Sequence, residues 1–174
     1  KAGTVNPNLV SSVDIARTFM DFAGAKYGNT FVGKSFAPML ENPKASIRNY
    51  AFGEKNWHDF SDRCRYVRGE RFKYIRNFYP HYPNTPSADA LRSPVFRTMQ
   101  KLRDAGKLNA AQMNCFIKPR PKEELYDLEN DPYELNNLAG KPQYAMHLKR
   151  LRAELKGWQK RTDDREPEFE APDE

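Results

Sequence analysis

The segment Glu124–Leu138 constrains the fold most, because it joins a short apolar strand to a tight acidic turn. The leucines of Leu125–Leu128 can be buried, while Asp131-Pro132 reverses the chain, since proline presets φ and aspartate stabilises a turn. After the turn, Leu135 and Leu138 are expected to pack back against the strand. The segment therefore predicts a strand, a turn and an ordered exit.

Large side chains near the end of the chain predict a long helix that opens at Pro142. They recur at alternating steps of four and three residues, which places them on one helical face. The pattern covers barely two heptads, too few for a coiled coil, so it favours a helix that docks on a sheet. Its members are Tyr144, Leu148, Leu151, Leu155 and Trp158.

Two further stretches have strand character. Ile47–Phe52 is one, and Cys64–Phe78 predicts a hairpin that turns at Gly69-Glu70 and presents Val67, Phe72 and Tyr74 to one face. Combined with the strand at Leu125–Leu128, they predict an α+β fold. Its architecture is a small antiparallel β-sheet packed against a long C-terminal helix.

The remaining elements are helical or irregular. Asn8–Gly24 predicts an amphipathic helix with its apolar residues on one face, and Gly24 can end it. The proline-rich stretch 78–94 predicts a surface loop, after which Ser93-Pro94 opens a helix. A second short helix is expected over Asn109–Phe116.

The formal net charge is +6, and the basic residues are not gathered into one block. This balance suits a polyanion such as nucleic acid, anionic lipid or sulfated glycan, and equally a soluble protein with a basic solvated surface. No nucleic-acid-binding module is visible, and no apolar run is long enough to span a bilayer. The first residues lack a signal-peptide core, so an export signal would lie upstream.

Cys64 and Cys115 are the only cysteines. They can pair, but two separated cysteines are more often free and partly buried. The chain has no Cys-x-x-Cys or His-x-x-x-His spacing, so a structural zinc site is not expected. Phosphate-loop, dinucleotide-binding and serine-nucleophile motifs are also absent from the sequence.

Tyr50–Phe60 is the most chemically suggestive segment. A strand is expected to end at Gly53, and the loop beyond it gathers polar and aromatic side chains that a sheet could hold in place for binding. These side chains belong to Glu54, Lys55, Asn56, Trp57, His58 and Asp59.

Five residues are candidates for substrate binding. His58 can exchange a hydrogen bond with a sugar hydroxyl or a leaving group, and Asp59 can orient the imidazole or bind a hydroxyl itself. Trp57 offers a flat face for a sugar ring, or alternatively folds inward as an anchor. Arg65 is chosen from the following hairpin because a guanidinium pairs bidentately with sulfate or carboxylate. Glu54 completes the set, and no catalytic residue or metal ligand is assigned.

The Glu124–Leu138 segment closely resembles the C-terminal hallmark of the sulfatases, enzymes similar in fold to alkaline phosphatase. Further matches follow in one order from Leu9 to Asp164, and this order is more specific than any single motif. The matches are Leu9–Thr18, Gly33–Leu40, the Arg65–Ile75 hairpin and the closing helix near Trp158. The Phe52–Phe60 loop, the proline-rich insert and Pro119-Arg120-Pro121 look most like the N-sulfoglucosamine sulfohydrolase (heparan sulfamidase) branch.

The resemblance implies a hydrolase that uses a formylglycine, made from Cys or Ser in a Cys/Ser-x-Pro-x-Arg motif, and a calcium ion that polarises the sulfate. Neither Cys64 nor Cys115 begins this motif. By resemblance, therefore, neither formylglycine nor calcium is carried by this chain. The chain is expected to supply substrate-pocket residues beside a catalytic centre that an N-terminal part of the same protein builds.

The resemblance also divides the chain: residues 1–44 end the catalytic domain, 45–162 form the C-terminal subdomain, and 163–174 form an acidic tail. It implies an exported protein (periplasmic, extracellular or lysosomal) and leaves room for a homodimer. The expected function is hydrolysis of sulfate esters or sulfamates on carbohydrates of the N-sulfoglucosamine or heparan type. The main alternative is a non-catalytic basic module that binds sulfated glycans. Another hydrolase of the superfamily, such as a phosphodiesterase, is less favoured by the hallmark.

Overall fold

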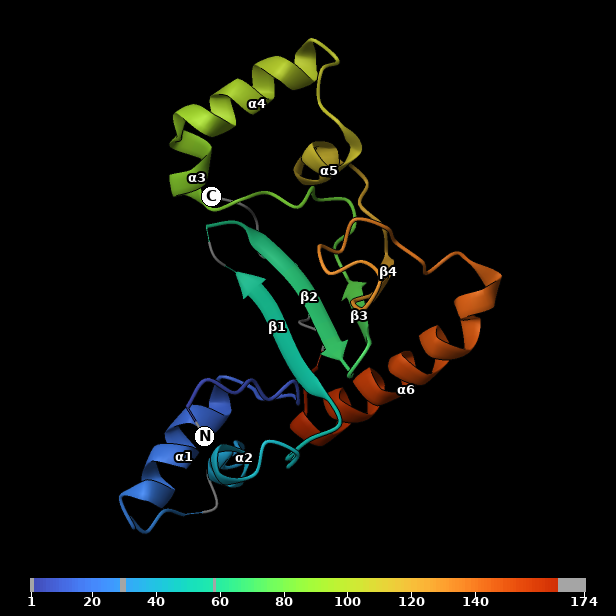
Figure 1. Cartoon of the computed structure of the whole chain (residues 1–174). Coiled ribbons are helices and arrows are strands. Elements are labelled where there is room, and N and C mark those ends of the chain that lie inside the picture. Colours follow the sequence, from blue (N-terminus) through green and yellow to red (C-terminus); the bar gives the residue numbers. More distant parts are fainter. Residues whose placement is uncertain (1, 29–30, 58, 166–174) are drawn as a thin grey trace.

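The computed structural model describes residues 2–28, 31–57 and 59–165, and within them the chain forms one four-stranded antiparallel sheet (Figure 1). The strands lie in the sheet in their order along the chain. They are β1 (Ala51–Trp57), β2 (Ser61–Arg68), β3 (Phe72–Asn77) and β4 (Glu123–Asp127). The predicted hairpin is confirmed: β2 and β3 pair antiparallel, from Arg68 opposite Lys73 to Cys64 opposite Asn77.

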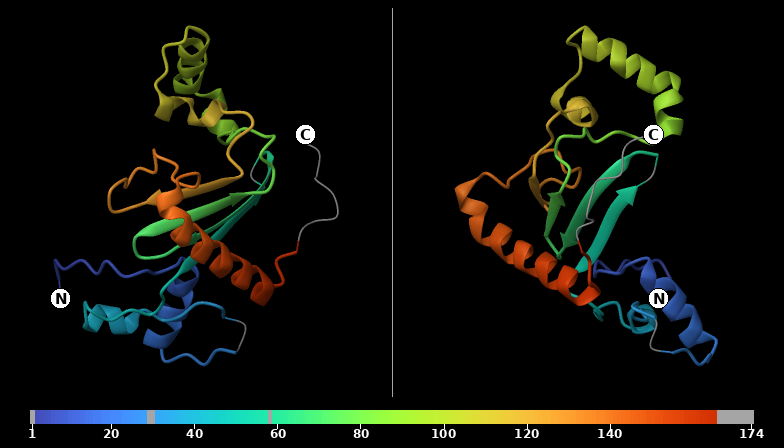
Figure 2. Two further views of the ribbon diagram at one scale, coloured as in Figure 1. Left: turned by 90° about the vertical axis from the view of Figure 1, so that its right-hand side faces the viewer. Right: turned by 180° about the vertical axis from the view of Figure 1, so that it is seen from behind.

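A long helix, α6 (Ala145–Thr162), packs across one face of the sheet after a 3-10 turn, η2 (Pro142–Tyr144) (Figure 2). The helix and the sheet share one core because the predicted leucine stripe faces the inward side chains of the strands. The buried members of this core are Val67, Phe72, Tyr74, Leu125, Leu138, Leu148, Leu151 and Leu155. The α+β class is therefore confirmed, with the small antiparallel sheet packed against the long C-terminal helix.

The turn after β4 forms as expected, with one difference. The Asp131 carboxylate accepts hydrogen bonds from the backbone N–H of Leu135 at 3.1 Å and of Asn136 at 2.7 Å. Leu138 is buried, and its N–H donates to the Leu125 carbonyl at 2.8 Å. The expected burial of Leu135 is wrong, because the turn leaves its side chain 59% exposed.

The N-terminal helices α1 (Val13–Phe22) and α2 (Ala37–Glu41) lie at one end of the sheet (Figures 1 and 2). The buried residues of α1 are polar: Asp14 accepts hydrogen bonds from the N–H of Ser11 and of Lys34 and pairs with Arg48, while Thr18 contacts the loop before α2. The predicted apolar face of this helix is largely exposed among the described residues.

A helical insertion between β3 and β4 projects from the opposite end of the sheet (Figure 2). We call it the helical arm (residues 81–119). It contains α3 (Ala88–Arg92), α4 (Pro94–Asp104), α5 (Ala110–Met113) and the 3-10 turn η1 (Asn114–Phe116). None of the residues in these helices is buried. The Ser93 hydroxyl caps α4 by accepting from the Phe96 N–H at 3.1 Å, as the sequence predicts.

Hydrogen bonds join the chain at the end of β3 to the chain just before β4, at the base of the arm. The N–H of Asn77 donates to the carbonyl of Lys122 at 3.0 Å, and the N–H of Arg120 donates to the carbonyl of Pro80 at 2.9 Å. The arm therefore leaves and re-enters the sheet at one point.

Candidate functional site

The chemically suggestive segment is a hairpin and not a loop that follows Gly53. β1 continues to Trp57, which lies opposite Ser61 on β2. Gly53 does not end the strand but makes room for the ring of Tyr66. A Cβ on Gly53 would lie only 2.3 Å from the nearest atom of that ring. The expected strand end at Gly53 is therefore wrong, because close packing and not a turn explains this glycine.

A cavity of about 1010 Å³ lies between the tip of this hairpin and the root of the helical arm. Figure 1 shows the hairpin tip below α3. The hairpin contributes Glu54, Lys55, Asn56, Trp57, Asp59, Phe60, Ser61 and Asp62. The other wall comes from Tyr82–Ser87, Leu91 and Cys115. A cavity of this size can hold a ligand of one or two sugar rings.

The structure brings together three of the five predicted residues. Glu54, Trp57 and Asp59 all line the cavity. The Trp57 side chain is 46% exposed, so it is not a buried anchor and its ring is accessible from the cavity. The Asp59 carboxylate accepts a hydrogen bond at 2.6 Å from the N–H of Ala88, the first residue of α3. This bond ties the hairpin to the arm across the cavity. The fourth predicted residue, His58, lies outside the described residues.

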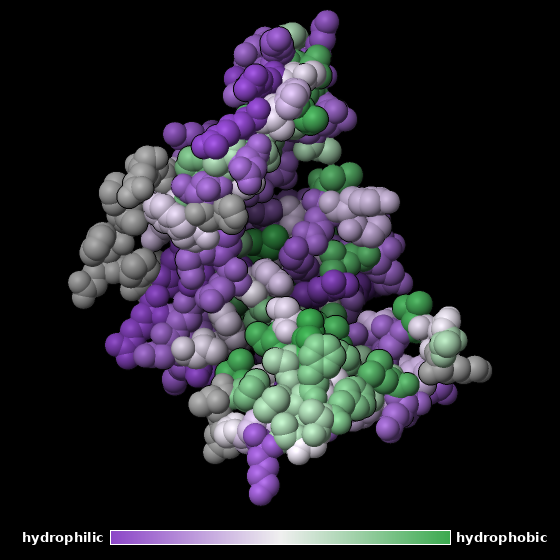
Figure 3. All heavy atoms as spheres, turned by 90° about the vertical axis from the view of Figure 1, so that its left-hand side faces the viewer, coloured by the Kyte–Doolittle hydropathy of each residue, from purple (hydrophilic) through white to green (hydrophobic). Residues whose placement is uncertain are grey.

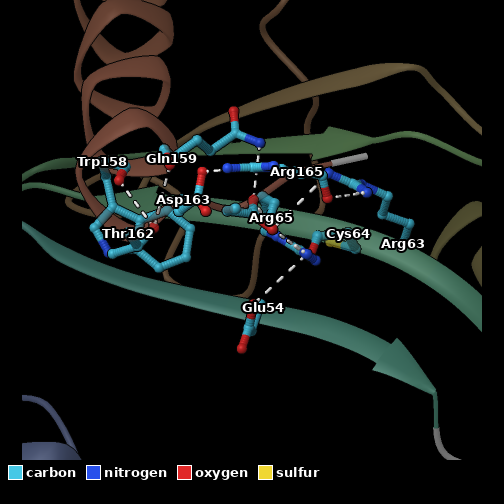
Figure 4. A network of polar contacts seen from close by, with 10 residues as sticks. Glu54, Arg63, Cys64, Arg65, Trp158, Gln159, Thr162, Asp163 and Arg165 are labelled. Carbon is cyan, nitrogen blue, oxygen red and sulfur yellow. Dashed lines mark hydrogen bonds and ion pairs between the residues drawn. The ribbon is translucent and has the colours of Figure 1, made fainter. Parts of the chain in front are cut away.

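Arg65, the fifth predicted residue, does not line the cavity. Its guanidinium is nearly buried and pairs bidentately with the Asp164 carboxylate, at 2.8 and 2.7 Å. This pairing holds the pKa of the Asp164 carboxyl below its ordinary value. Arg65 also lies 3.6 Å from Glu54, which does line the cavity (Figure 4). In this arrangement Arg65 touches the site only through Glu54.

A buried ion pair at the floor of the cavity was not singled out from the sequence. Asp62 on β2 accepts hydrogen bonds from both terminal nitrogens of Arg120 and lies 3.1 Å from the ammonium of Lys55. Burial opposes ionisation of Asp62, yet the hydrogen bonds and charges of Arg120 and Lys55 leave its pKa below the ordinary value. Arg120 lies 58 residues away along the chain, so no local pattern connects it with Asp62.

Carboxylates outnumber cationic groups on the lining of the cavity. Among the described residues that line it, three are carboxylates (Glu54, Asp59 and Asp62) and one, Lys55, is an ammonium. Two of these carboxylates also face guanidinium groups behind the lining, Asp62 that of Arg120 and Glu54 that of Arg65. Carboxylates accept hydrogen bonds from hydroxyl and amino groups but repel a sulfate. The lining therefore suits the hydroxyl-bearing body of a sugar better than its sulfate.

The described residues do not fit a formylglycine or a calcium ion. Neither Cys64 nor Cys115 begins a Cys-x-Pro-x-Arg motif, and burial raises the pKa of the Cys64 thiol to about 11. In the part of the chain that the structure covers, no three His, Cys, Asp or Glu side chains are grouped to hold a metal. Nor does any helix within those residues combine the length and apolar character needed to cross a membrane.

An apolar surface covers the outer side of α1 and its surroundings (Figure 3, lower part). Phe19 is 68% exposed and Phe22 62% exposed, values that are unusual for phenylalanine in a folded protein. Other exposed apolar residues of α1 and of the segments near it in the chain include Val13, Ile15, Val32 and Leu40.

The chain matches known proteins over most of its length. A family model described as N-sulphoglucosamine sulphohydrolase, C-terminal, matches residues 1–94. An ulvan-active sulfatase of Formosa agariphila is 38% identical over 160 residues, which is 91% of this chain and 26% of the relative. The N-sulphoglucosamine sulphohydrolase of Homo sapiens is 29% identical over 183 residues, covering 98% of this chain and 36% of the relative.

A solved structure is similar as well. A protein in complex with its substrate, D-glucosamine-2-N,6-O-disulfate, matches with a TM-score of 0.58 and 26% identity, over 88% of this chain and 24% of that chain. The chain thus spans between 24% and 36% of the length of these three proteins.

Proposed function

The chain belongs to the family of C-terminal N-sulphoglucosamine sulphohydrolase domains, the sulfatases that the sequence resembles, and on this premise we propose that it forms the C-terminal part of a carbohydrate sulfatase. The whole protein hydrolyses sulfate esters or sulfamates on sugars. This chain supplies the pocket for the sugar, and the rest of the protein supplies the chemistry. The cavity at the hairpin tip is the observation that carries the proposal.

The composition of the cavity supports this division of labour. Trp57 gives a sugar ring an accessible aromatic face, and Glu54 and Asp59 give its hydroxyl or amino groups acceptors. The carboxylates of the lining direct the sulfate away from this wall, toward cationic groups outside it. His58 joins this set as a proposed donor to the substrate, and Arg65 as the residue that positions Glu54.

Under this proposal, the N-terminal part of the same protein carries the formylglycine and the calcium ion. Formylglycine and calcium are general features of the sulfatases that this sequence resembles, and neither fits the described residues of this chain. We infer that residues 1–44 end the catalytic domain, residues 45–162 form the C-terminal subdomain and residues 163–174 form a tail. The exposed apolar surface of α1 then packs on the catalytic part. The whole protein is exported, as the resemblance implies.

Sulfate release by the full-length protein tests the proposal. The substrates are D-glucosamine-2-N,6-O-disulfate and fragments of ulvan, the two sulfated carbohydrates named for the proteins that this chain resembles. Trp57→Ala should raise KM about tenfold, because loss of a stacking face costs roughly 1–1.5 kcal/mol. Tyr133→Ala is the control: Tyr133 is also an exposed aromatic residue, but it lies outside the cavity. Equal kinetics of the two variants would exclude the cavity as the substrate pocket.

The binding-module alternative predicts a different result. The natural polypeptide would have the 20.2 kDa mass of this chain, and it would retain sulfated glycans without releasing sulfate. A much larger intact mass together with sulfate release would exclude that alternative.

A further inference from the structure

The helical arm carries a concentration of positive charge that the cavity does not use. It holds six basic and two acidic residues, and its basic side chains are all exposed. Within the described part of the chain, only Arg103 of these six has an ion-pair partner, Asp104. The others are Arg92, Arg97, Lys101, Lys107 and Lys118. The upper part of Figure 3 shows the arm as a mostly hydrophilic surface.

These charges begin at the wall of the cavity. Ser87 and Leu91 line it, and Arg92 follows directly at the end of α3. Beyond Ser93, α4 leads away from the cavity and carries Arg97 and Lys101 on one face, four residues and so about 6 Å apart along the helix axis. The row of cations therefore extends outward from the place where a sugar would bind.

The arm does not serve the core of this chain. Its helices contain no buried residue, and their apolar side chains pack among themselves, as in the contact of Phe96 with Phe116 at 5.4 Å between ring centroids. Arg97 and Lys101 lie on the side of α4 opposite Phe96, Met99 and Leu102. Contact with the core therefore does not explain this face.

We propose that the basic face of the arm binds the neighbouring anionic units of a sulfated polysaccharide whose terminal sugar occupies the cavity. This inference rests on the proposed function and extends it from a single sugar to a polymer. Charge complementarity identifies the occupant: the carboxylates of the cavity lining accept hydrogen bonds from hydroxyl groups, whereas the arm beside it is basic and binds sulfate or carboxylate groups. A polymer can satisfy both surfaces at once.

Elution of the full-length protein from immobilised heparin with rising salt tests the inference. Arg97→Gln/Lys101→Gln should elute at lower salt than the wild-type protein and bind heparin about two- to tenfold more weakly, as expected for two exposed ion pairs. The control is Lys149→Gln/Lys156→Gln, which removes the same charge from the exposed face of α6, away from the cavity. Circular dichroism confirms that all three proteins are folded.

Three outcomes are distinct. Earlier elution of the arm variant alone supports the inference, and a fall in its kcat/KM for a sulfated polymer relative to that for D-glucosamine-2-N,6-O-disulfate strengthens it. Equal elution of the arm variant and the α6 control overturns it, while sulfate release by the wild-type protein still upholds the proposed function. If the wild-type protein releases no sulfate from either substrate, the proposed function fails, and elution still decides whether the arm binds a sulfated chain.

Discussion

Two ion pairs between individual residues stabilise the candidate site. Asp62 and Arg120 are both buried and paired under the cavity, and Arg65 and Asp164 form a second such pair beside it. Each pair joins a strand of the hairpin to a distant segment: the base of the arm in one case and the end of α6 in the other. The cavity wall therefore depends on partners that its own sequence segment does not contain.

Asp62→Asn should destabilise the full-length protein by about 3–5 kcal/mol at neutral pH, because it leaves the buried Arg120 without a counter-charge. Asp104→Asn, at the exposed pair with Arg103, should cost less than about 1 kcal/mol. The folded-state pKa of Asp62 is lowered, so its contribution is complete above the ordinary value of 3.8 and is lost as the pH falls through the lowered pKa.

The stability difference between the wild-type protein and Asp62→Asn should therefore shrink as the pH falls below about 4. Denaturant unfolding of both proteins over this pH range measures it. A difference that stays constant on acidification would show that Asp62 acts through packing and not through its charge.

The elements differ in how well the sequence predicts them. The β2–β3 hairpin, the α6 stripe and the Ser93 cap were predicted correctly, because alternation, heptad spacing and capping are properties of neighbouring residues. The end of β1 and the exposure of Leu135 were not, because each depends on a partner elsewhere. Gly53 shows the difficulty: a glycine that accommodates the Tyr66 ring cannot be told from one that ends a strand.

The residues of the candidate site also differ in how well the sequence predicts them. Glu54, Trp57 and Asp59 could be found because they adjoin one another in a polar segment. The Asp62–Arg120 pair and the cavity wall at Tyr82–Ser87 could not, since only the folded chain brings them to the hairpin. Arg65 carried the right chemistry for an anion, but the structure gives it the Asp164 carboxylate.

The contact between α1 and the loop before α2 depends on a second glycine. A Cβ at Gly33 would lie 2.0 Å from the carbonyl oxygen of Val13, a backbone atom that cannot move aside easily. Gly33→Ala should cost about 1–3 kcal/mol, the usual range for overpacking. Gly140→Ala is the control, since a Cβ there meets no atom within 4 Å. Thermal unfolding compares the two variants, and equal midpoints would mean that the loop yields without cost.

The three surfaces to which we assign functions are distributed along β1. The apolar surface of α1 lies at one end of the strand, and the cavity and the basic arm lie at the other (Figures 1 and 2). The strand has seven residues and so extends about 23 Å. Within the described residues β1 is an edge strand of the sheet. A catalytic part that covers α1 and also reaches the cavity must therefore extend along this edge.

Phe19→Ala tests that assembly in the full-length protein. If the catalytic part covers α1, the substitution should cost about 3 kcal/mol or more, as for a buried phenylalanine. Met146→Ala on the outer face of α6, where Met146 is also largely exposed, should have little effect. Equally small losses of stability in both variants would mean that α1 remains open to solvent in the full-length protein.

The closed base of the helical arm allows the length and sequence of the arm to change without disturbing the sheet. Because hydrogen bonds join the two ends of the arm at Asn77–Lys122 and Pro80–Arg120, strands β3 and β4 stay in register whatever lies between them. Lengthening such an excursion is inexpensive, about 0.6 kcal/mol for each doubling. Under the proposed function, evolution can therefore replace the arm as a unit and change the glycan preference without altering the sheet that carries the cavity.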